Sequence, residues 1–542
     1  MRFLSIVLAS LIWAAPAHAD WHEASSDNFV VYADDKAADV EEFTLMLERY
    51  HSALELLTGR KIAKPSPSNR VTIFAVGNTR KVAKLATGDS GASIAGFYVP
   101  RAGASRAFVP DVRISHRETR FSMTVLLHEY AHHFLIGTSR YSMPAWLREG
   151  SAEFFASARF PKDGSVHIGR PAYHREGDFA YSAEYSVRDL VDPSTNHRNG
   201  GYYAWAWALY HHLNFDPGRQ GQLSTYWRAL ASGVEPMQAA QETFGDLEIL
   251  QGEVEASLKK RMMSFYNLKP DMLPTPTVTV RRLSEGHGEV MPLIIRSQRG
   301  VNRETALELL PDVQEVAAEY PDDPWVLAAL AEAEHDAGNY ASSIAAADKA
   351  IAANPAVKNA YVQKGFSLFA LAEDAEPDAQ EAAYAGAMEP FSALNKLEND
   401  HPLPLIYYYQ SYVQRGEPPS ELARAALEQA AALAPFDQGL WLQAAIMQGY
   451  EGQVQLARLS LSPLASDPHG GARSQAAAIV VSELAELPDG EPVSIPELLS
   501  AAMEGGEGGD GGSDEVADAG VDEGADNGSD AGDDAGATAS GN

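Results

Sequence analysis

Cysteine is absent from all 542 residues of the sequence. Without thiols the chain cannot form disulfides, thiolate zinc sites or iron–sulfur clusters, and it offers neither a thiol nucleophile nor a cysteine for lipoprotein attachment. A metal ion would have to bind through His, Asp or Glu side chains, so the search for a metal site narrows to these residue types.

Basic residues are scarce relative to acidic ones, with 42 Lys and Arg against 74 Asp and Glu and a formal net charge of −32. A chain this acidic repels the phosphate backbone, so we expect no nucleic-acid partner. Hydrophobic residues make up 45% and charged residues 21% of the sequence, the balance of a globular protein. The length allows about three to four domains.

Long apolar runs are missing after the amino terminus. Arg2, the apolar stretch 3–15 and the small-x-small pattern at 17–19 predict a secretory signal peptide over residues 1–19, with a mature chain beginning at Asp20. The alternative is an anchor that stays attached. No later stretch reaches about 18 uninterrupted apolar residues, so we expect no membrane span after signal removal and an exported protein, periplasmic or secreted.

The last forty residues, 503–542, contain no Lys or Arg and are rich in Gly, Asp and Glu. Such a segment cannot bury enough apolar surface to offset its ordering entropy, which predicts a disordered acidic tail. The fragment 505–510 partly resembles a calcium-binding β-roll repeat. It occurs once, and Gly512 stands where a large apolar residue is needed, so a solvated tail is the better interpretation.

Residues 20–115 alternate strand-like and helix-like segments, which is an α+β pattern. The candidate strands lie at 29–32, 71–76, 95–99 and 107–109, the last two as a hairpin pair, and a candidate helix lies at 37–57. Residues 116–268 are expected to be mainly helical, with helices over 117–136, 144–158 and 202–213. We take 20–268 as one domain, followed by a linker over the proline-containing segment 269–302.

Residues 303–470 are rich in Ala and Leu and are predicted to form helical pairs. The stretch 325–355 resembles one tetratricopeptide repeat, and later units follow near the 34-residue period, although 372–399 departs from it. We expect a short solenoid whose concave surface holds peptides or a partner protein. The alternative is an ordinary helical domain, and 471–502 is taken as a further helical or linker segment.

The segment from His128 to His132 has the pattern HExxH. Two histidines at i and i+4 lie on one face of a helix, where both imidazoles can reach one metal ion. Glu129 is placed to accept a proton from the water that such a metal activates. The alternative is a helix with structurally satisfied histidines. A second expected helix follows shortly and carries Glu149 and Glu153, which lie four residues apart and therefore on one face.

HExxH followed by a short turn and a WLxEG helix resembles the gluzincin zinc peptidases, including the aminopeptidase N family. The longer form P-x-W-L-x-E-G-x-A-E looks most like exported peptidase-MA-like proteins. The resemblance implies an α+β gluzincin-like catalytic domain, a Zn²⁺ cofactor and Glu149 as the third metal ligand after His128 and His132. Sixteen residues separate His132 from Glu149, slightly fewer than in that aminopeptidase family.

The same resemblance suggests two further roles. In thermolysin-like relatives an acid at the position of Glu153 holds a zinc-ligand histidine from behind, and such contacts fix the orientation of the ring. The alternative for Glu153 is a surface acid. A tyrosine in a Y-x-x-G-x-A-L pattern stabilises the oxyanion in aminopeptidase relatives, and Tyr203 matches it with Ala206 in place of Gly. Tyr202 competes for this role, and aromatic packing is the alternative for both.

Several other histidines are weaker candidates. His133 follows a predicted ligand but lies about 100° further round the helix, so we expect it to point elsewhere. The remaining candidates for oxyanion stabilisation are His174, His197, His211 and His212.

These features predict an exported zinc-dependent peptidase that acts on a peptide or protein substrate, with helical repeats that recruit substrate or a protein partner. The first alternative is a catalytically silent, zinc-containing scaffold whose repeats mediate protein–protein interaction. The second alternative keeps the zinc hydrolase but changes the bond, for example a cell-wall peptide cross-link or an epoxide.

Overall fold

The structure is a computed structural model that describes residues 20–92, 94–138, 143–193, 195, 199–465, 467 and 471–506. The predicted signal peptide, His197 and the acidic tail from residue 507 lie outside the described residues. The prediction of disorder is wrong for 503–506, because helix α22 (Ile495–Gly506) continues through them. No described helix has both the length and the apolar character that crossing a membrane requires.

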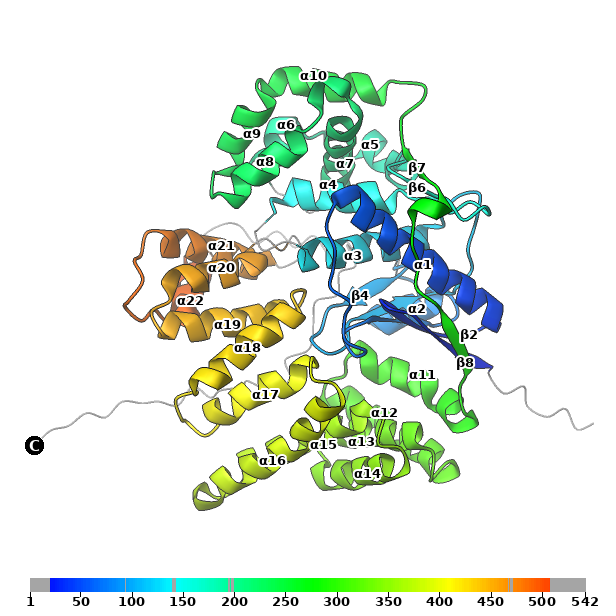
Figure 1. The fold of residues 1–542 in the computed structure, drawn as a ribbon, viewed down its shortest axis with the longest axis vertical. Helices are drawn as coiled ribbons and strands as arrows, with labels where there is room; N and C mark the ends of the chain where they lie inside the picture. Colours follow the sequence, from blue (N-terminus) through cyan, green and yellow to red (C-terminus); the bar gives the residue numbers. More distant parts are fainter. Residues whose placement is uncertain are drawn as a thin grey trace, which may run out of the picture.

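A six-stranded mixed sheet lies at the centre of the amino-terminal part, in the strand order β4-β5-β3-β2-β1-β8 (Figure 1). Strands β2, β3 and β5 are parallel to one another. Strand β1 pairs antiparallel with β2, β4 pairs antiparallel with β5, and β8 pairs antiparallel with β1. The strands are β1 (Trp21–Ser25), β2 (Phe29–Asp34), β3 (Val71–Ala75), β4 (Phe97–Val99), β5 (Arg106–Val109) and β8 (Thr279–Arg282). The expected strands are present, and β4 and β5 form the expected antiparallel pair with Phe97 opposite Phe108.

The segment 269–302 is not the linker that its prolines predicted. Strand β8 extends the sheet by pairing with β1, and helix α11 (Glu285–Arg299) packs against the sheet through Met291 and Ile295. Edge pairing with β1 and a buried apolar face on α11 stabilise this segment, and neither contact is visible in its local composition. The chain therefore returns to the amino-terminal sheet before the repeats begin.

The other face of the sheet carries the main core and the helices that build the site. Helix α1 (Ala37–Thr58) packs on the sheet and contacts α3 (Phe121–Gly137), and α4 (Ala145–Ala156) lies between α3 and α7 (Gly200–Phe215). The remaining elements of this part are α2 (Thr79–Thr87), β6 (Val166–Ile168), η1 (Tyr173–Arg175), α5 (Glu176–Tyr181), α6 (Val187–Val191), η2 (Pro217–Arg219), α8 (Gln222–Ala231), α9 (Pro236–Phe244), α10 (Leu247–Leu258), β7 (Tyr266–Leu268) and η3 (Pro270–Met272).

Consecutive helices pack on one another from α11 to the end of the described chain, so the carboxy-terminal half is a stack of helical pairs. The helices are α12 (Arg303–Glu319), α13 (Pro324–Asp336), α14 (Tyr340–Ala353), α15 (Lys358–Glu373), α16 (Pro377–Leu397), α17 (Pro402–Val413), α18 (Glu421–Leu433), α19 (Gln438–Tyr450), α20 (Val454–Ala465), α21 (Gly471–Ala485) and α22. The stacking continues through α21 and α22, beyond residue 470.

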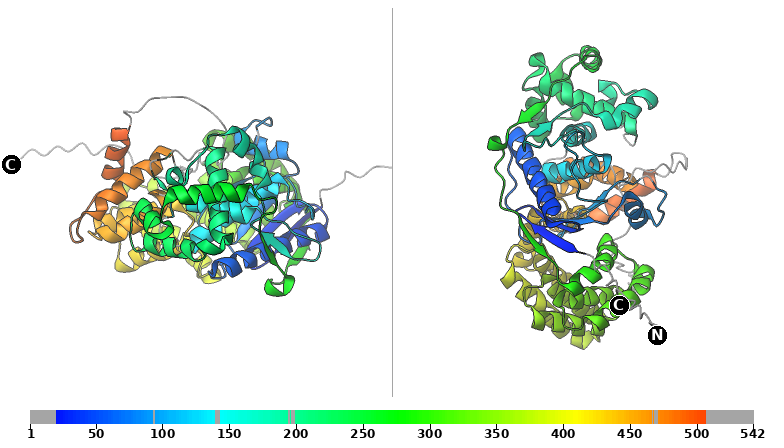
Figure 2. Two further views of the ribbon diagram at one scale, coloured as in Figure 1. Left: turned by 90° about the horizontal axis from the view of Figure 1, so that it is seen from above. Right: turned by 90° about the vertical axis from the view of Figure 1, so that its right-hand side faces the viewer.

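The stack bends back towards the amino-terminal domain, from α12–α14 below the sheet to α20 and α21 beside α3 (Figures 1 and 2). Hydrogen bonds from two loops of the amino-terminal domain help to hold the two parts together. Ala102 N–H donates to Asp437 Oδ2 at 2.8 Å, and the Ser68 backbone and hydroxyl donate to the Glu398 carboxylate at 2.9 and 3.0 Å. The concave side of the stack therefore faces the helix that carries HExxH.

Candidate metal centre

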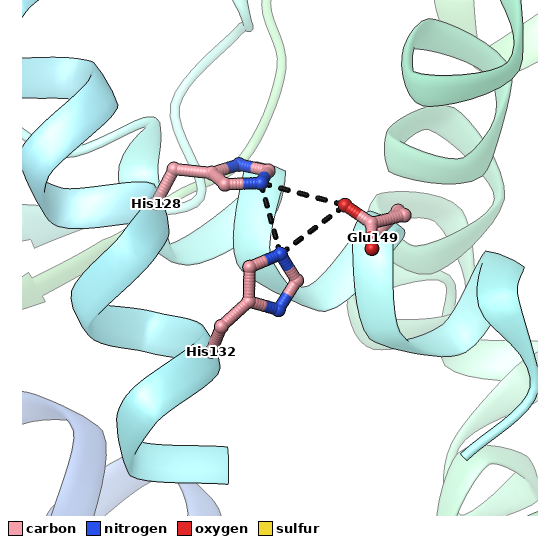
Figure 3. A group of neighbouring side chains, drawn as sticks. All are labelled: His128, His132 and Glu149. Carbon is pink, nitrogen blue, oxygen red and sulfur yellow. Dashed lines mark hydrogen bonds and ion pairs between the residues drawn. The ribbon is translucent and has the colours of Figure 1, made fainter. Parts of the chain in front are cut away.

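Helix α3 places His128 and His132 on one face, one turn apart. Their Nε2 atoms lie 3.0 Å from each other and the rings are nearly perpendicular, at 83°. Tyr50 of helix α1 donates a hydrogen bond from its hydroxyl to Leu127 O at 3.0 Å, which anchors α3 directly beside His128. The two ring nitrogens thus point to a common position (Figure 3).

Glu149 approaches that position from helix α4. Its Oε2 lies 3.2 Å from His132 Nε2 and 3.4 Å from His128 Nε2, and its side chain is fully buried. The neighbouring Gly150 allows α4 to pack closely on α7, because a Cβ added there would overlap the backbone carbonyl of Ala206. Close packing of α4 at this glycine sets the position of Glu149.

These three residues could hold a metal ion. Their ligand atoms lie within 4.8 Å of one another, and two imidazoles with one carboxylate are the donor set of a catalytic zinc site with an open position. Ligand atoms about 2.0–2.1 Å from a tetrahedral zinc ion lie roughly 3.3 Å apart, close to the observed spacing. Three acceptor atoms this close repel one another unless a cation or shared protons lie between them, so the donor set fits zinc.

The electrostatics of the cluster favour positive charge. Burial raises the pKa of Glu149, but the facing His132 and His128 outweigh burial and hold this pKa well below its usual range. Burial lowers the pKa of His128, but hydrogen bonds to Glu149 and Glu153 dominate and raise it to about 10. A buried site with two carboxylates beside its imidazoles therefore attracts a cation.

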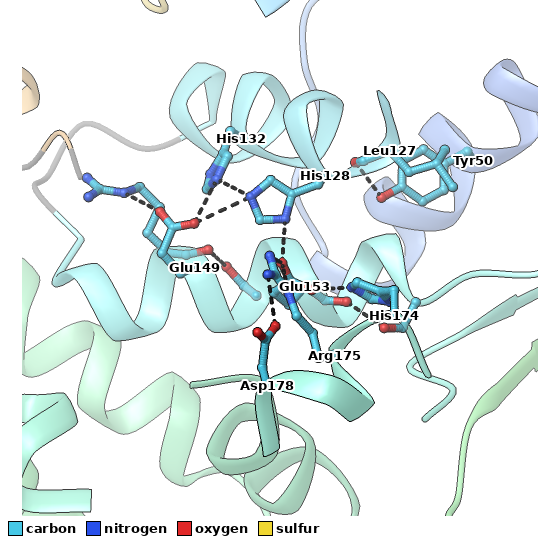
Figure 4. Close-up of polar contacts among 12 residues, drawn as sticks. Tyr50, Leu127, His128, His132, Glu149, Glu153, His174, Arg175 and Asp178 are labelled. Atoms are coloured by element: carbon cyan, nitrogen blue, oxygen red, sulfur yellow. Dashed lines mark hydrogen bonds and ion pairs between the residues drawn. The ribbon is translucent and has the colours of Figure 1, made fainter. Parts of the chain in front are cut away.

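Glu153 lies behind His128, on the side away from Glu149 (Figure 4). Its Oε1 is 3.1 Å from His128 Nδ1, which leaves His128 Nε2 directed at the common position. His174 Nε2 and Arg175 Nη2 contact the same carboxylate at 2.6 and 2.5 Å. Burial raises the pKa of Glu153, but Arg175 and His174 hold it well below its usual range, so the carboxylate stays ionised. This is the geometry expected of an acid that orients a metal ligand.

Glu129 and Tyr203 both line the cavity that contains the cluster. The Tyr203 ring lies 6.3 Å from the His128 ring and beneath the Arg175 guanidinium at 4.8 Å. Tyr202, in contrast, is turned into the core and donates its hydroxyl to Leu190 O at 3.2 Å. Of the two candidate tyrosines, the geometry favours Tyr203.

Within the described residues, the other candidate histidines lie outside the ligand set. His133 Nδ1 contacts the Tyr98 hydroxyl at 2.7 Å and its ring packs against Phe436 of the repeats, so it points away from the cluster. His211 contacts the backbone oxygen of Ser264, and His212 contacts Glu253. His174 reaches the cluster, but as a partner of Glu153.

Two arginines beside the cluster are absent from the sequence-based prediction. Arg175 binds Glu153 and Asp178, and Arg148 lies one residue before Glu149 with its Nε 3.4 Å from Glu149 Oε1. Position 148 is the variable residue of WLxEG, so the motif carries no signal for it. Arg175 comes from a separate 3-10 turn, and only tertiary contacts bring it to the site.

The cluster opens into a cavity of about 2400 Å³ between the domain and the repeats. Strand β4, an edge strand of the sheet, lines the cavity beside α3. The repeats contribute aromatic, aliphatic and polar side chains to the opposite wall, among them Trp325, Gln363, Phe366, Phe436, Trp441 and Leu459. His128 and His132 therefore line the same cavity as these side chains of the repeats.

No protein-family model matches the sequence, and no curated protein matches it. Among solved structures, the chain is similar to the crystal structure of a thermophilic TPR protein from Thermus thermophilus. That similarity has a TM-score of 0.31 at 16% identity and covers 37% of this chain and 100% of the other. At this level it carries no argument, and the description of the repeats rests on the helix packing itself.

Proposed function

We propose that the protein is an exported zinc-dependent peptidase. The observation that carries the proposal is the convergence of His128, His132 and the buried Glu149, where the two histidines line a large cavity together with Glu129. A zinc ion in this site would act as a Lewis acid that makes water a competent nucleophile at neutral pH. A purely structural zinc site usually has four protein ligands, whereas the three ligands here leave one position open for water, as in a catalytic site.

Each neighbouring residue then has a chemical role. Glu129 accepts a proton from the attacking water and returns it to the leaving amine. Tyr203 donates its hydroxyl to the carbonyl oxygen as charge develops there. Glu153 holds the His128 ring in one orientation through Nδ1, and Arg175 with His174 keeps Glu153 ionised.

The cavity supports a polypeptide substrate. The free edge of β4 offers backbone groups to an extended chain beside α3, which is a common mode of peptide binding. On the opposite wall, Gln363 donates to Asn359 at 3.1 Å while its own Oε1 is buried and accepts no hydrogen bond from the described residues. These features extend the binding surface well beyond the metal cluster.

The decisive experiment compares the wild-type chain with Glu129→Gln on a peptide library. Loss of the general base should lower hydrolysis by about 10²- to 10⁴-fold, while zinc stays bound because Glu129 is not a ligand. Glu389→Gln, an exposed acid on α16, is the matched control and should cleave like wild type. Equal activity of wild type and Glu129→Gln would contradict the mechanism.

A second candidate is a protein-binding scaffold that holds zinc without catalysis. It is supported by the helical repeats, since stacked helical pairs commonly form protein-binding surfaces. Under this hypothesis the wild-type chain loaded with zinc would cleave nothing in the library, and Glu129→Gln would behave identically to it.

A further inference from the structure

Two arginines flank the cluster, and they differ in how far their donors are satisfied. Arg175 places Nη2 and Nε 2.5 and 3.1 Å from Glu153 Oε1, and Nη1 3.2 Å from Asp178 Oδ2. Its guanidinium face also lies over the Tyr203 ring. Two carboxylates and one aromatic ring thus surround Arg175, and it has little capacity left for a ligand.

Arg148 has far fewer partners although it is more deeply buried. Its side chain is 7% exposed, and within the described residues its guanidinium makes one polar contact, from Nε to Glu149 Oε1 at 3.4 Å. Nη1 and Nη2, which carry four of the five N–H donors, have no acceptor there. Neither nitrogen is among the fully buried polar atoms that lack a partner, so both are open to the cavity that Arg148 lines. Because a guanidinium stays protonated, these donors are available to an anionic ligand there.

The position of Arg148 in the cavity indicates where such a ligand would bind. Arg148 lines the same cavity as His128, Glu129 and His132, and it is adjacent in sequence to the metal ligand Glu149. Glu149 offers little compensation, because its Oε2 is directed to the two histidines and its Oε1 contact is long. The unused donors therefore belong to the part of the cavity that borders the candidate reaction centre.

We infer that Arg148 forms a carboxylate-binding subsite next to the bond that is cleaved. Nη1 and Nη2 of one guanidinium match the two oxygens of a carboxylate in a planar, bidentate pair. In a polypeptide substrate this carboxylate is either an Asp or Glu side chain or the free carboxy terminus, at a fixed distance from the scissile bond. The inference rests on the proposed peptidase function and names the substrate class of that same site.

The test uses the full mature chain and two peptide libraries of identical sequence, one with free and one with amidated carboxy termini. Cleavage sites are mapped by mass spectrometry for wild type, Arg148→Gln, Arg148→Lys and Arg101→Gln. Arg101 is the matched control because it also lines the cavity, in the β4–β5 turn where it faces the acids of the repeats. Zinc content is measured for each variant.

We expect wild type to prefer a carboxylate at one fixed position from the cleaved bond. An enrichment of Asp and Glu in both libraries identifies a side chain, and cleavage confined to the free-terminus library identifies the carboxy terminus. Arg148→Gln should reduce this preference by about ten- to hundredfold relative to uncharged sites, the loss expected for a charge-assisted hydrogen-bond pair. Arg101→Gln should keep it.

Three results would overturn the inference. Cleavage by wild type without any carboxylate preference would do so while leaving the peptidase function intact, whatever the folding of the variants. A uniform fall of zinc content and of activity towards all substrates in both Arg148 variants, with the carboxylate preference of the residual cleavage unchanged, would make Arg148 only a positioning residue for Glu149. A zinc-loaded wild type that cleaves neither library would refute the peptidase function, and the inference with it.

Discussion

The amino-terminal domain and the helical repeats bury their apolar surface in different ways. The main core of the domain joins residues from Ala24 to Leu273, so its contacts bridge the whole domain. The repeats contain small clusters of near neighbours, such as the one from Leu327 to Ala360. Long-range packing fixes side chains relative to one another, whereas short-range packing builds a surface that extends by repetition. The candidate metal site formed by His128, His132 and Glu149 lies in the first region, and the opposite wall of the adjoining cavity lies in the second.

The largest expected effect tests whether packing in the amino-terminal domain positions Glu149 as a metal ligand. Glu149→Ala removes one of three ligands from a buried site and should abolish stoichiometric zinc binding, with affinity reduced at least about 10- to 100-fold, the loss typical even of outer contacts. Metal content of the purified chain, titrated with a chelator, measures this. The control is Glu129→Gln, which should keep one zinc per chain. If Glu149→Ala retained zinc, the zinc site would lie elsewhere in the chain.

The second effect tests the close approach of α4 to α7. A Cβ at Gly150 would lie 2.8 Å from the carbonyl carbon of Ala206, so Gly150→Ala forces the helices apart and should destabilise the domain by about 1–3 kcal/mol. Because Glu149 moves with α4, zinc affinity should fall as well. Thermal unfolding with and without zinc provides the measurement, and unchanged stability would show that α4 is free to shift.

The third effect concerns the boundary between the two regions. Glu398 accepts two hydrogen bonds from Ser68 and lies 2.5 Å from Lys358 Nζ. Burial raises the pKa of Glu398, but Lys358 and the serine donors outweigh burial and lower it overall. A lowered folded-state pKa adds stability above the unfolded pKa, and this stability disappears as pH falls through the folded value.

Glu398→Gln should therefore cost about 1–3 kcal/mol at pH 7, and the difference from wild type should shrink as pH falls below about 4. Denaturant unfolding across this pH range gives the measurement. Glu389→Gln, which changes an exposed acid on α16, serves as the control. A difference that grows towards low pH would reverse the assigned sign.

The smallest effect lies in the repeats and should have the opposite sign to that at Gly150. Gly386 sits within helix α16, and a Cβ added there meets no atom within 4 Å. Gly386→Ala removes backbone freedom from the unfolded chain and should stabilise the protein by about 0.4–1 kcal/mol. Calorimetry of both Gly→Ala variants compares the two regions directly, and destabilisation at position 386 would contradict the description of an open repeat surface.

Much of the site can be predicted because helix periodicity acts locally. The i, i+4 spacing of His128 and His132 places both rings on one face in any helix, and the same holds for Glu149 and Glu153. The choice between Tyr202 and Tyr203 cannot be made in this way, because adjacent residues differ only in what lies around them. The prediction of a linker at 269–302 was wrong because the structure of this segment also depends on its surroundings. Strand β8 forms by pairing with β1, which is more than 250 residues away in sequence.

The sequence by itself determined the helices that carry the candidate ligands, most strands of the sheet and the helical repeats, because these follow from periodicity and from residue types suited to metal binding. Tertiary structure alone decided the rest. It brought α3 and α4 together through Gly150, placed His174 and Arg175 on Glu153, left the terminal nitrogens of Arg148 without an acceptor among the described residues, and bent the repeats over the same cavity. These are contacts between segments distant in sequence, and their free energy depends on packing that no local pattern records.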